Sequence, residues 1–220
     1  MRLIAFMVVA LVTLTPLLAF AETVLFADSF EGKLDTGWSW VRENKEAWRV
    51  TEKGLQIRIE PGNMWGGKND AKNVLVRALP PIPEDGIAVT VTVANKPTSQ
   101  YEQVDLVWYY NDSNMVKIGL EQVDEVLEMV MGREEDDKTN TVLKLPVDST
   151  TLQVRFVVRG TTIRGEYRPG ATGEWLVAGE CELPVDGEPK VSLQAYQGPA
   201  DAEHWATYTD FCISTAPKPK

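Results

Sequence analysis

Alternation of apolar and polar residues with a period of two dominates this sequence, and it is the feature that most restricts the fold. Gly54 to Ile59 and Ile87 to Val93 alternate almost without a break, and no stretch of ten or more residues shows a clear helical period. This pattern predicts an all-β chain. The predicted strands are 23–26, 47–50, 54–59, 73–77, 87–93, 103–110, 115–120, 126–131, 152–158, 162–167, 175–178, 190–196 and 206–213.

So many strands in one domain favour two packed sheets over one open sheet. Turn residues such as Pro61-Gly62-Asn63 and Pro169-Gly170 separate the strand candidates, as expected for antiparallel connections. The acidic stretch 134–140 is predicted to be a solvated loop. The predicted architecture is therefore a two-sheet antiparallel β-sandwich over 22–214, followed by a disordered tail over 215–220.

The N-terminal 21 residues have the organisation of a signal peptide. Arg2 supplies the positive charge, an apolar run extends from Leu3 to Phe20, and Ala19-Phe20-Ala21 provides a small-x-small cleavage pattern. A membrane anchor is the competing interpretation, because the run approaches the length that spans a bilayer. Thr13, Thr15 and Pro16 weaken that interpretation. We expect cleavage before Glu22, no membrane insertion afterwards, and a secreted or periplasmic protein.

The balance of charge limits the partners of the protein. The formal net charge is −10. An acidic chain is repelled by phosphate backbones and by anionic lipid, so we expect no nucleic-acid partner. Much of this charge serves solubility.

Two cysteines, Cys181 and Cys212, lie in predicted strands. In an exported protein they are candidates for a disulfide bond. Their Cα atoms can approach within about 7 Å only if the two strands are neighbours. The alternative is two buried thiols that act as small apolar residues.

Several motifs, in this order, resemble those of concanavalin A-like lectin/glucanase domains. Asp28-Ser29-Phe30 and Gly37-Trp38-Ser39-Trp40 resemble a "D-x-F … W-x-W" opening, and Val116-Lys117-Ile118-Gly119-Leu120-Glu121 resembles a "V-K-L-G-L-E" strand. Val104 to Asp112 and Tyr208-Thr209-Asp210-Phe211 are similar to later family segments. The chain is most similar to the C-terminal sandwich domain of family 43 β-xylosidases and its stand-alone relatives. The resemblance implies a jelly-roll sandwich, a fold that hosts lectins, glycosidases and structural modules alike.

A retaining glycosidase needs two carboxylates about 5 Å apart. The nearest match to the glucanase pattern E-x-D-x-(x)-E is Gln122 to Glu128, where Gln122 replaces the nucleophile. The resemblance places Asp124 and Glu125 in a hairpin turn, where both acids are solvated. We therefore assign no catalytic residues.

His204 is the only histidine. The sequence contains no G-x-S-x-G nucleophile elbow with which this histidine could form a catalytic triad. One histidine and two cysteines are also too few ligands for a structural zinc site. His204, next to Trp205, is interpreted as a surface residue or as a hydrogen-bonding partner for a sugar.

Calcium is the metal that the resemblance implies, as a structural ion between the first and last strands. An aspartate similar to Asp210 and oxygens near Asp28 and Glu31 would hold it. The alternative is that Asp210 bonds to the backbone at a strand crossing.

Seven Trp and six Tyr residues make the chain rich in aromatic side chains. Flat aromatic rings stack on the apolar faces of sugars, while polar side chains bind the hydroxyl groups. In the strand 103–110 we expect Trp108, with Val104 and Leu106, to face the core, and Tyr109, Asp105 and Gln103 to face outward. Trp38, Trp40 and Trp48 are expected to pack in the core. The predicted ligand-binding residues are Trp65, Asp105, Tyr109, Tyr196, His204 and Trp205.

These features favour a secreted, non-catalytic, lectin-like module that binds a polysaccharide or other glycan. A structural or protein-interaction module of the cell envelope is the alternative, for which an exposed apolar patch would be the sign. A glycoside hydrolase is the less favoured interpretation.

Overall fold

The computed structural model describes residues 22–185 and 187–219, so the predicted signal peptide lies outside the described residues. The chain forms short antiparallel strands almost throughout, with one 3-10 turn. The elements are β1 (Val24–Asp28), β2 (Trp38–Val41), η1 (Lys45–Ala47), β3 (Trp48–Thr51), β4 (Gly54–Arg58), β5 (Val74–Ala78), β6 (Ile87–Ala94), β7 (Gln103–Asn111), β8 (Asn114–Val123), β9 (Val126–Glu135), β10 (Lys138–Pro146), β11 (Thr151–Arg159), β12 (Thr162–Arg168), β13 (Leu176–Glu182), β14 (Lys190–Tyr196) and β15 (Trp205–Thr215).

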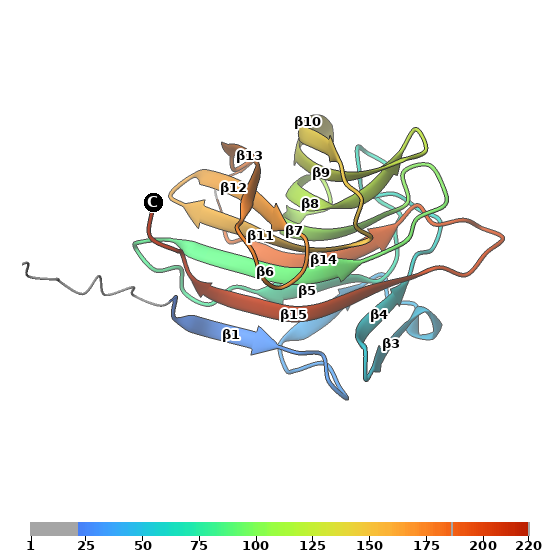
Figure 1. Cartoon of the computed structure of the whole chain (residues 1–220), viewed down its shortest axis with the longest axis horizontal. Coiled ribbons are helices and arrows are strands. Elements are labelled where there is room, and N and C mark those ends of the chain that lie inside the picture. Colours follow the sequence, from blue (N-terminus) through green and yellow to red (C-terminus); the bar gives the residue numbers. More distant parts are fainter. Residues whose placement is uncertain (1–21, 186, 220) are drawn as a thin grey trace, which may run out of the picture.

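The strands form two antiparallel sheets that pack face to face (Figure 1). One, the β15 sheet, has the order β13-β12-β11-β6-β15-β4-β3, with β1 paired to β15. The other, the β7 sheet, has the order β10-β9-β8-β7-β14-β5-β2. The predicted all-β, two-sheet antiparallel sandwich is confirmed.

Period-two patterning decides which side chains enter the core between the sheets. In β7, Val104, Leu106 and Trp108 join the main hydrophobic cluster. Their neighbours Asp105 and Tyr109 lie on the outer face of the β7 sheet, as predicted, because successive side chains of a strand point in opposite directions. The outer face of this sheet is where the candidate site lies.

The opening motif of the sequence has a structural purpose. The buried Asp28 carboxylate accepts hydrogen bonds from the Phe30 and Asp35 backbone N–H groups (2.8 and 3.0 Å) and from Trp38 Nε1 (2.9 Å). The rings of Phe30 and Trp38 both pack against Phe211. Trp40 and Trp48 pack together and against the core. The motif therefore fixes β1 and β2 to β15.

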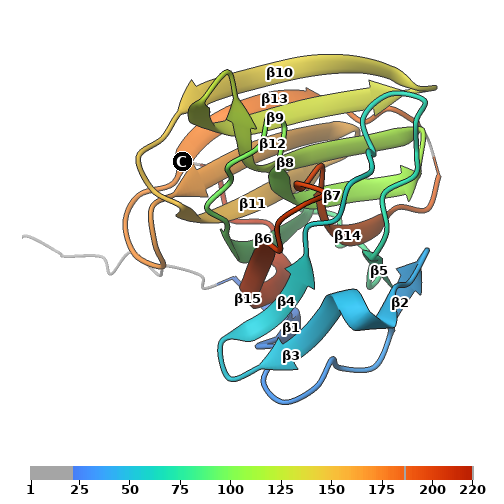
Figure 2. The same ribbon diagram turned by 90° about the vertical axis from the view of Figure 1, so that its right-hand side faces the viewer.

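Residues 59–73, which we call the bridging segment, connect β4 of one sheet to β5 of the other. Figure 2 shows this segment rising past the strands of the β7 sheet before it returns to β5. Met64 and Ala71 of the segment form a second apolar cluster with Tyr109, Met115 and other outer-face residues. The bridging segment thus covers part of the outer face of the β7 sheet.

Two strands were not predicted from the sequence. The stretch 134–140 is not a solvated loop: β9 continues to Glu135, Asp136 and Asp137 form the turn with φ of 50° and 61°, and β10 begins at Lys138. Positive φ at both central residues is typical of a tight hairpin turn. β10 was missed because it is an edge strand with mostly exposed polar residues, and β2 because it is only four residues long.

The predicted disulfide bond is wrong. Cys181 and Cys212 are free thiols among the described residues. Cys181 lies on β13 and Cys212 on β15, with β12, β11 and β6 between them. Four strand spacings amount to about 19 Å, far beyond the reach of a disulfide.

The prediction that the tail is disordered from residue 215 is wrong for its first residues. β15 includes Thr215, the Ala216 N–H donates to the Gly86 carbonyl (3.1 Å), and Arg159 donates to the Pro217 carbonyl. These contacts hold the chain against the end of the β15 sheet. Within the described residues, the chain contains no helix that is long and apolar enough to span a membrane.

Candidate functional site

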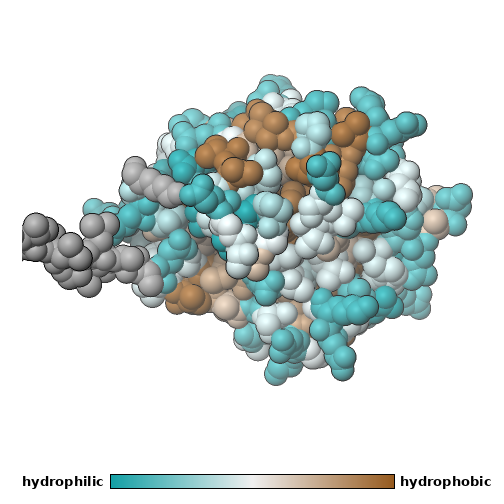
Figure 3. Space-filling model, in the orientation of Figure 1, coloured by the Kyte–Doolittle hydropathy of each residue, from teal (hydrophilic) through white to brown (hydrophobic). Residues whose placement is uncertain are grey.

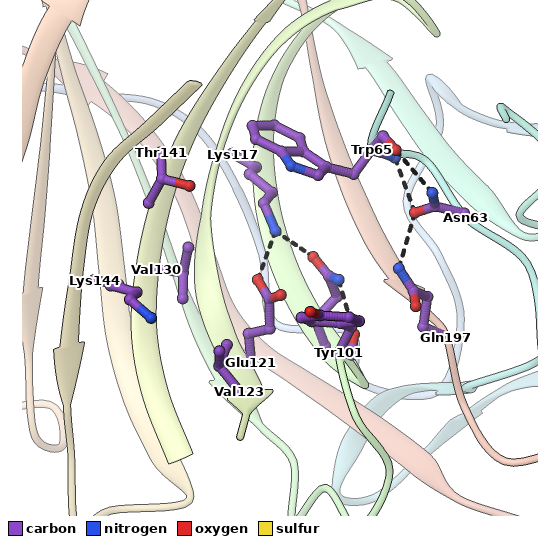
Figure 4. Close-up of a pocket in the computed structure, with 11 residues that line it drawn as sticks. Asn63, Trp65, Tyr101, Lys117, Glu121, Val123, Val130, Thr141, Lys144 and Gln197 are labelled. Atoms are coloured by element: carbon purple, nitrogen blue, oxygen red, sulfur yellow. Dashed lines mark hydrogen bonds and ion pairs between the residues drawn. The ribbon is translucent and has the colours of Figure 1, made fainter. Parts of the chain in front are cut away.

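A hollow of about 590 Å³ lies on the outer face of the β7 sheet, beside the bridging segment (Figure 4). Strands β7 to β10 provide its floor and one side, and the bridging segment and the loops around Tyr101 and Gln197 provide the other. Its lining residues are Asn63, Trp65, Tyr101, Gln103, Lys117, Glu121, Val123, Val130, Thr141, Lys144 and Gln197.

Trp65 is held in a fixed position at the edge of the hollow. Its backbone N–H and carbonyl bond to the Asn63 side chain (3.0 and 2.7 Å), and the next N–H, of Gly66, donates to the Glu134 carboxylate (3.1 Å). The indole lies against Gly132 of β9: a Cβ atom there would be 2.4 Å from the ring. The absence of a side chain at Gly132 therefore makes room for Trp65.

The floor of the hollow is a hydrogen-bonded row of polar side chains. Lys117 Nζ donates to Gln103 Oε1 and to Glu121 Oε2, the latter at 2.8 Å. Gln103 Nε2 donates in turn to the Tyr101 carbonyl (2.8 Å). Lys117 Nζ also lies 5.0 Å from the centre of the Trp65 ring. Figure 4 shows Trp65 and Tyr101 on opposite sides of this ammonium group.

Asp105 lies next to this row and is fully buried. Within the described chain, neither carboxylate oxygen has a hydrogen bond of standard geometry. Burial raises the pKa of Asp105 to about 7, while Lys117 acts to lower it and Glu121 to raise it. The Tyr196 hydroxyl is close enough to lower this pKa slightly. Asp105 Oδ1 occupies the space above Gly119, where a Cβ atom would approach it to 2.5 Å.

Burial acts to lower the pKa of Lys117, but the carboxylates of Glu121, Asp105 and Glu134 together raise it above its ordinary value. Lys117 is therefore charged at neutral pH. Its ammonium group is the shared counter-ion of several acids beneath the hollow.

The six residues predicted to bind a ligand do not lie together in the structure. Trp65 lines the hollow. Asp105 lies beneath it. Tyr109 and Tyr196 are on the same face but are buried under the bridging segment, and the Tyr109 hydroxyl donates to Asp112 (2.7 Å).

His204 and Trp205 do not reach the hollow. His204 Nδ1 lies 2.9 Å from the buried Glu102 carboxylate, which also accepts the N–H groups of Thr98 and Ser99. Trp205 starts β15 on the other sheet, where the Arg49 guanidinium lies 4.0 Å from its ring. Both side chains hold loops and strands together.

The predicted turn at Asp124 and Glu125 is confirmed, because β8 ends at Val123 and β9 begins at Val126. These two acids therefore lie in the connection between strands. The carboxyl groups that do gather on the outer face come instead from β7, β8 and β9.

Side chains that could hold a metal do not converge in the described part of the chain. Asp28 is engaged as described above, Asp210 accepts the hydroxyl groups of Thr92 and Thr209 (3.0 and 2.8 Å), and Glu31 is exposed. A calcium ion at this place stays a prediction, and it would depend on main-chain oxygens.

Sequence reasoning missed Lys117, Glu121, Tyr101, Asn63 and Gln197 as site residues. A signal for the first two is visible: Lys117, Gly119 and Glu121 alternate with apolar residues inside a long strand. Glycine inside a strand also marks a close approach of other atoms, as at Gly119 and Gly132. No comparable pattern identifies the three loop residues.

Comparison with known families gives one match. The family model of the β-xylosidase C-terminal concanavalin A-like domain matches residues 27–185. A search of curated proteins gave no match.

Solved structures with the same fold include glycoside hydrolases and one small protein. The GH43 protein BlXynB from Bacillus licheniformis has a TM-score of 0.73 and 21% identity, covering 86% of this chain and 39% of that chain. The xylan β-1,4-xylosidase from Bacillus halodurans C-125 has a TM-score of 0.72 and 13% identity, with 86% and 38% covered. A functionally unknown protein from Saccharomyces cerevisiae has a TM-score of 0.65 and 14% identity, with 84% and 98% covered. The chain thus spans about two fifths of the two bacterial proteins.

Proposed function

Because the chain belongs to the family of β-xylosidase C-terminal concanavalin A-like domains, we propose that it is a non-catalytic module that binds a saccharide in the hollow of the β7 sheet. The observation that carries this proposal is the fixed position of Trp65 opposite a row of hydrogen-bonding groups. A ring held in advance loses little freedom when a ligand binds, and this favours affinity.

The shape and chemistry of the hollow suit a sugar. Its volume of about 590 Å³ falls within the range of about 300–1,000 Å³ that is usual for small-molecule sites. Trp65 and Tyr101 offer flat apolar surfaces, and Gln103, Glu121 and Asn63 offer polar groups for hydroxyls. Similar structures include a xylan β-1,4-xylosidase and a GH43 protein of a Bacteroides ovatus xyloglucan locus, which suggests plant polysaccharides as the first ligands to test.

A binding role without catalysis is supported by the state of the acids near the hollow. Glu121 accepts a hydrogen bond from Lys117, and Asp105 exposes no surface to a ligand. Hydrolysis requires two accessible carboxyl groups on either side of a glycosidic bond. We expect no release of reducing sugar from any oligosaccharide that binds.

The proposal includes export of the protein. The arrangement of Arg2, the apolar run and Ala19-Phe20-Ala21 supports removal of residues 1–21. A secreted or periplasmic location would bring the hollow into contact with extracellular glycans.

The test is isothermal titration calorimetry with xylo-oligosaccharides, arabino-oligosaccharides and xyloglucan oligosaccharides. Trp65→Ala removes the aromatic surface, and we expect an affinity about tenfold lower, or ~1.4 kcal/mol. Gly132→Ala keeps the tryptophan but places a methyl group where the ring lies, so it should also weaken binding. Trp175→Ala is the matched control, because Trp175 precedes β13 and its ring packs against Arg155 and Arg168 of the β15 sheet.

Circular dichroism and thermal unfolding establish that each variant is folded. Binding that is unchanged in Trp65→Ala, or lost equally in Trp175→Ala, would place the ligand elsewhere. Failure of all these neutral saccharides to bind the native protein would refute the proposal.

The alternative role as an interaction module draws on one surface feature. Leu176 and Val177 of β13 are about half exposed, and Figure 3 shows apolar atoms gathered near the edges of β13 and β10. Small apolar patches of this kind are common on monomeric proteins. The hollow is the more specific feature, so saccharide binding is the better supported function.

A further inference from the structure

More acidic than basic side chains surround the hollow. Two ammonium groups, those of Lys117 and Lys144, line it. Lys117 is paired with Glu121 at 2.8 Å, and Lys144 lies 3.7 Å from Glu128. Both cations of the lining thus already have an anionic partner.

The partners of these lysines also face each other. Glu121 of β8 is directly opposite Glu128 of β9 in the antiparallel register. Like charges at such a pair of positions repel each other. The buried Lys117 on one flank and the half-exposed Lys144 on the other compensate for that repulsion. If either lysine paired with another anion, its glutamate would lose that compensation.

Two further carboxyl groups lie just behind the lining. Asp105 is fully buried with no hydrogen bond of standard geometry in the described structure. Glu134 is fully buried and accepts the Gly66 N–H. Burial raises the pKa of Glu134 as well as that of Asp105, in keeping with the scarcity of compensating positive charge. Altogether four carboxyl groups surround two ammonium groups.

Resting on the proposed function, we infer that the hollow takes uncharged saccharides and excludes those that carry a carboxylate, such as uronic acids. A sugar hydroxyl can donate to Glu121 and accept from a neighbouring N–H without adding charge. A sugar carboxylate brings a negative charge to a place where, among the described residues, both lining cations already have a carboxylate partner.

The exclusion is strengthened by burial. Lys117 has only 2% of its side chain exposed, so it cannot turn toward an added anion. Charges that are removed from water interact more strongly and are screened less by salt. The penalty for an acidic sugar therefore arises inside the site, in addition to any effect of the overall charge of −10.

Three ligands that differ at one position test this inference. Methyl β-xyloside has no substituent at C5, methyl β-glucoside has a neutral CH₂OH group, and methyl β-glucuronide has a carboxylate. NMR titration, observed at the Trp65 indole N–H, gives the affinity of each. We expect the glucuronide to bind about tenfold more weakly than the glucoside, which controls for size.

Glu128→Gln removes one carboxylate and frees Lys144, with almost no change of shape. In this variant, the affinity for the glucuronide should be lower than that for the glucoside by about threefold or less. Glu180→Gln is the control, because Glu180 is exposed on β13 of the other sheet and should leave the gap unchanged.

The outcomes separate the two proposals. Glucuronide binding as tight as glucoside binding in the native protein would overturn the inference and leave saccharide binding intact. A gap in affinity that persists in Glu128→Gln would also overturn it, because the exclusion would then not arise from the pairing of Lys144 with a carboxylate. Failure of all three glycosides to bind would refute saccharide binding in the hollow itself.

Discussion

Asp105 lies in an environment that does not suit an ionised carboxylate. An ionised carboxylate normally stays in water or is paired, because its burial without hydrogen bonds is costly. Here the nearest compensation is Lys117, which also serves Glu121. The protein reduces this cost by keeping Asp105 protonated up to about neutral pH.

This behaviour predicts a pH-dependent stability. Asp105 has a pKa of about 7 in the folded protein, against an ordinary 3.8. The protonated form favours folding, so its contribution is complete below 3.8 and is lost as the pH rises through 7. Asp105→Asn mimics the neutral form. The free energy of unfolding of Asp105→Asn, minus that of the native protein, should therefore be about 2–4 kcal/mol larger at pH 8 than at pH 4.

The measurement is urea unfolding of both proteins across this pH range. Glu180→Gln, at an exposed position, serves as the control and should show no such trend. A constant difference in stability between Asp105→Asn and the native protein would mean that folding does not change the pKa of Asp105.

For single residues, the sequence predicted which face of a strand a side chain occupies better than it predicted the contacts that the side chain makes. Alternation in 103–110 was enough to place Trp108 inward and Asp105 and Tyr109 outward. It could not show that the bridging segment would cover Tyr109, because that contact joins parts of the chain more than thirty residues apart. It also gave no reason to separate His204 from the hollow, because its partner Glu102 is brought to it only by the fold.

At the scale of elements, the hairpin turns of the β7 sheet are under backbone strain. Asp124 and Glu125 between β8 and β9 have φ of 50° and 67°, and neither is glycine. The left-handed conformation is costly for residues with a Cβ atom, although aspartate tolerates it better than most. Glu125 is exposed, so its replacement should alter the turn alone.

We expect Glu125→Gly to raise the free energy of unfolding by about 0.5 kcal/mol, since relief of strain exceeds the added freedom of the unfolded chain. Glu125→Val should lower it by about 1 kcal/mol, because a β-branched residue is poorly suited to positive φ. Chemical denaturation measures both changes. The same sign for the two variants would contradict this account of the turn.

The sequence predicted most strands but not β10 and β2, the two edge strands of the β7 sheet. Strands buried on one or both faces have a clear apolar pattern. β10 lacks it because an edge strand can keep its side chains in water. Charged residues on an edge also discourage pairing with another chain, so the feature that hid β10 is useful to the protein.

For the molecule as a whole, sheet order could not be read from the local pattern. Each cysteine was correctly placed in a strand, but the number of strands between them depends on the topology. With three strands separating β13 from β15, the two thiols should not pair with each other even in an oxidising compartment. Burial raises the pKa of the Cys181 thiol to about 11 and that of Cys212 above its ordinary value, which slows their reaction further.

We therefore expect two titratable thiols per chain when the purified, oxidised protein is denatured and treated with a thiol reagent. A reducing agent should leave the melting temperature unchanged. Fewer than two thiols in a monomer, or a lower melting temperature on reduction, would show that the sheet order is different from the one described.

The two-sheet architecture and the family could be predicted because ordered motifs span most of the chain. One of these motifs contains Asp28, Phe30 and Trp38, which fix β1 and β2 to β15. The hollow could not be predicted from the sequence in this way. It depends on a bridging segment that is fixed by contacts with distant strands.

The position of the bridging segment has a consequence for what the protein can recognise. A groove that is open at both ends admits the middle of a polymer, whereas a hollow that is closed at one end does not. Here the segment covers the surface over β5, β14 and part of β7, and Trp65 and Gly66 reach across to β9, so that only part of the surface over β8, β9 and β10 stays open. A polymer entering from the β10 side meets a wall. If the hollow binds a saccharide as proposed, it would therefore receive the terminus of a glycan chain, and the number of free chain ends, more than the mass of polymer, would set how much of the protein binds.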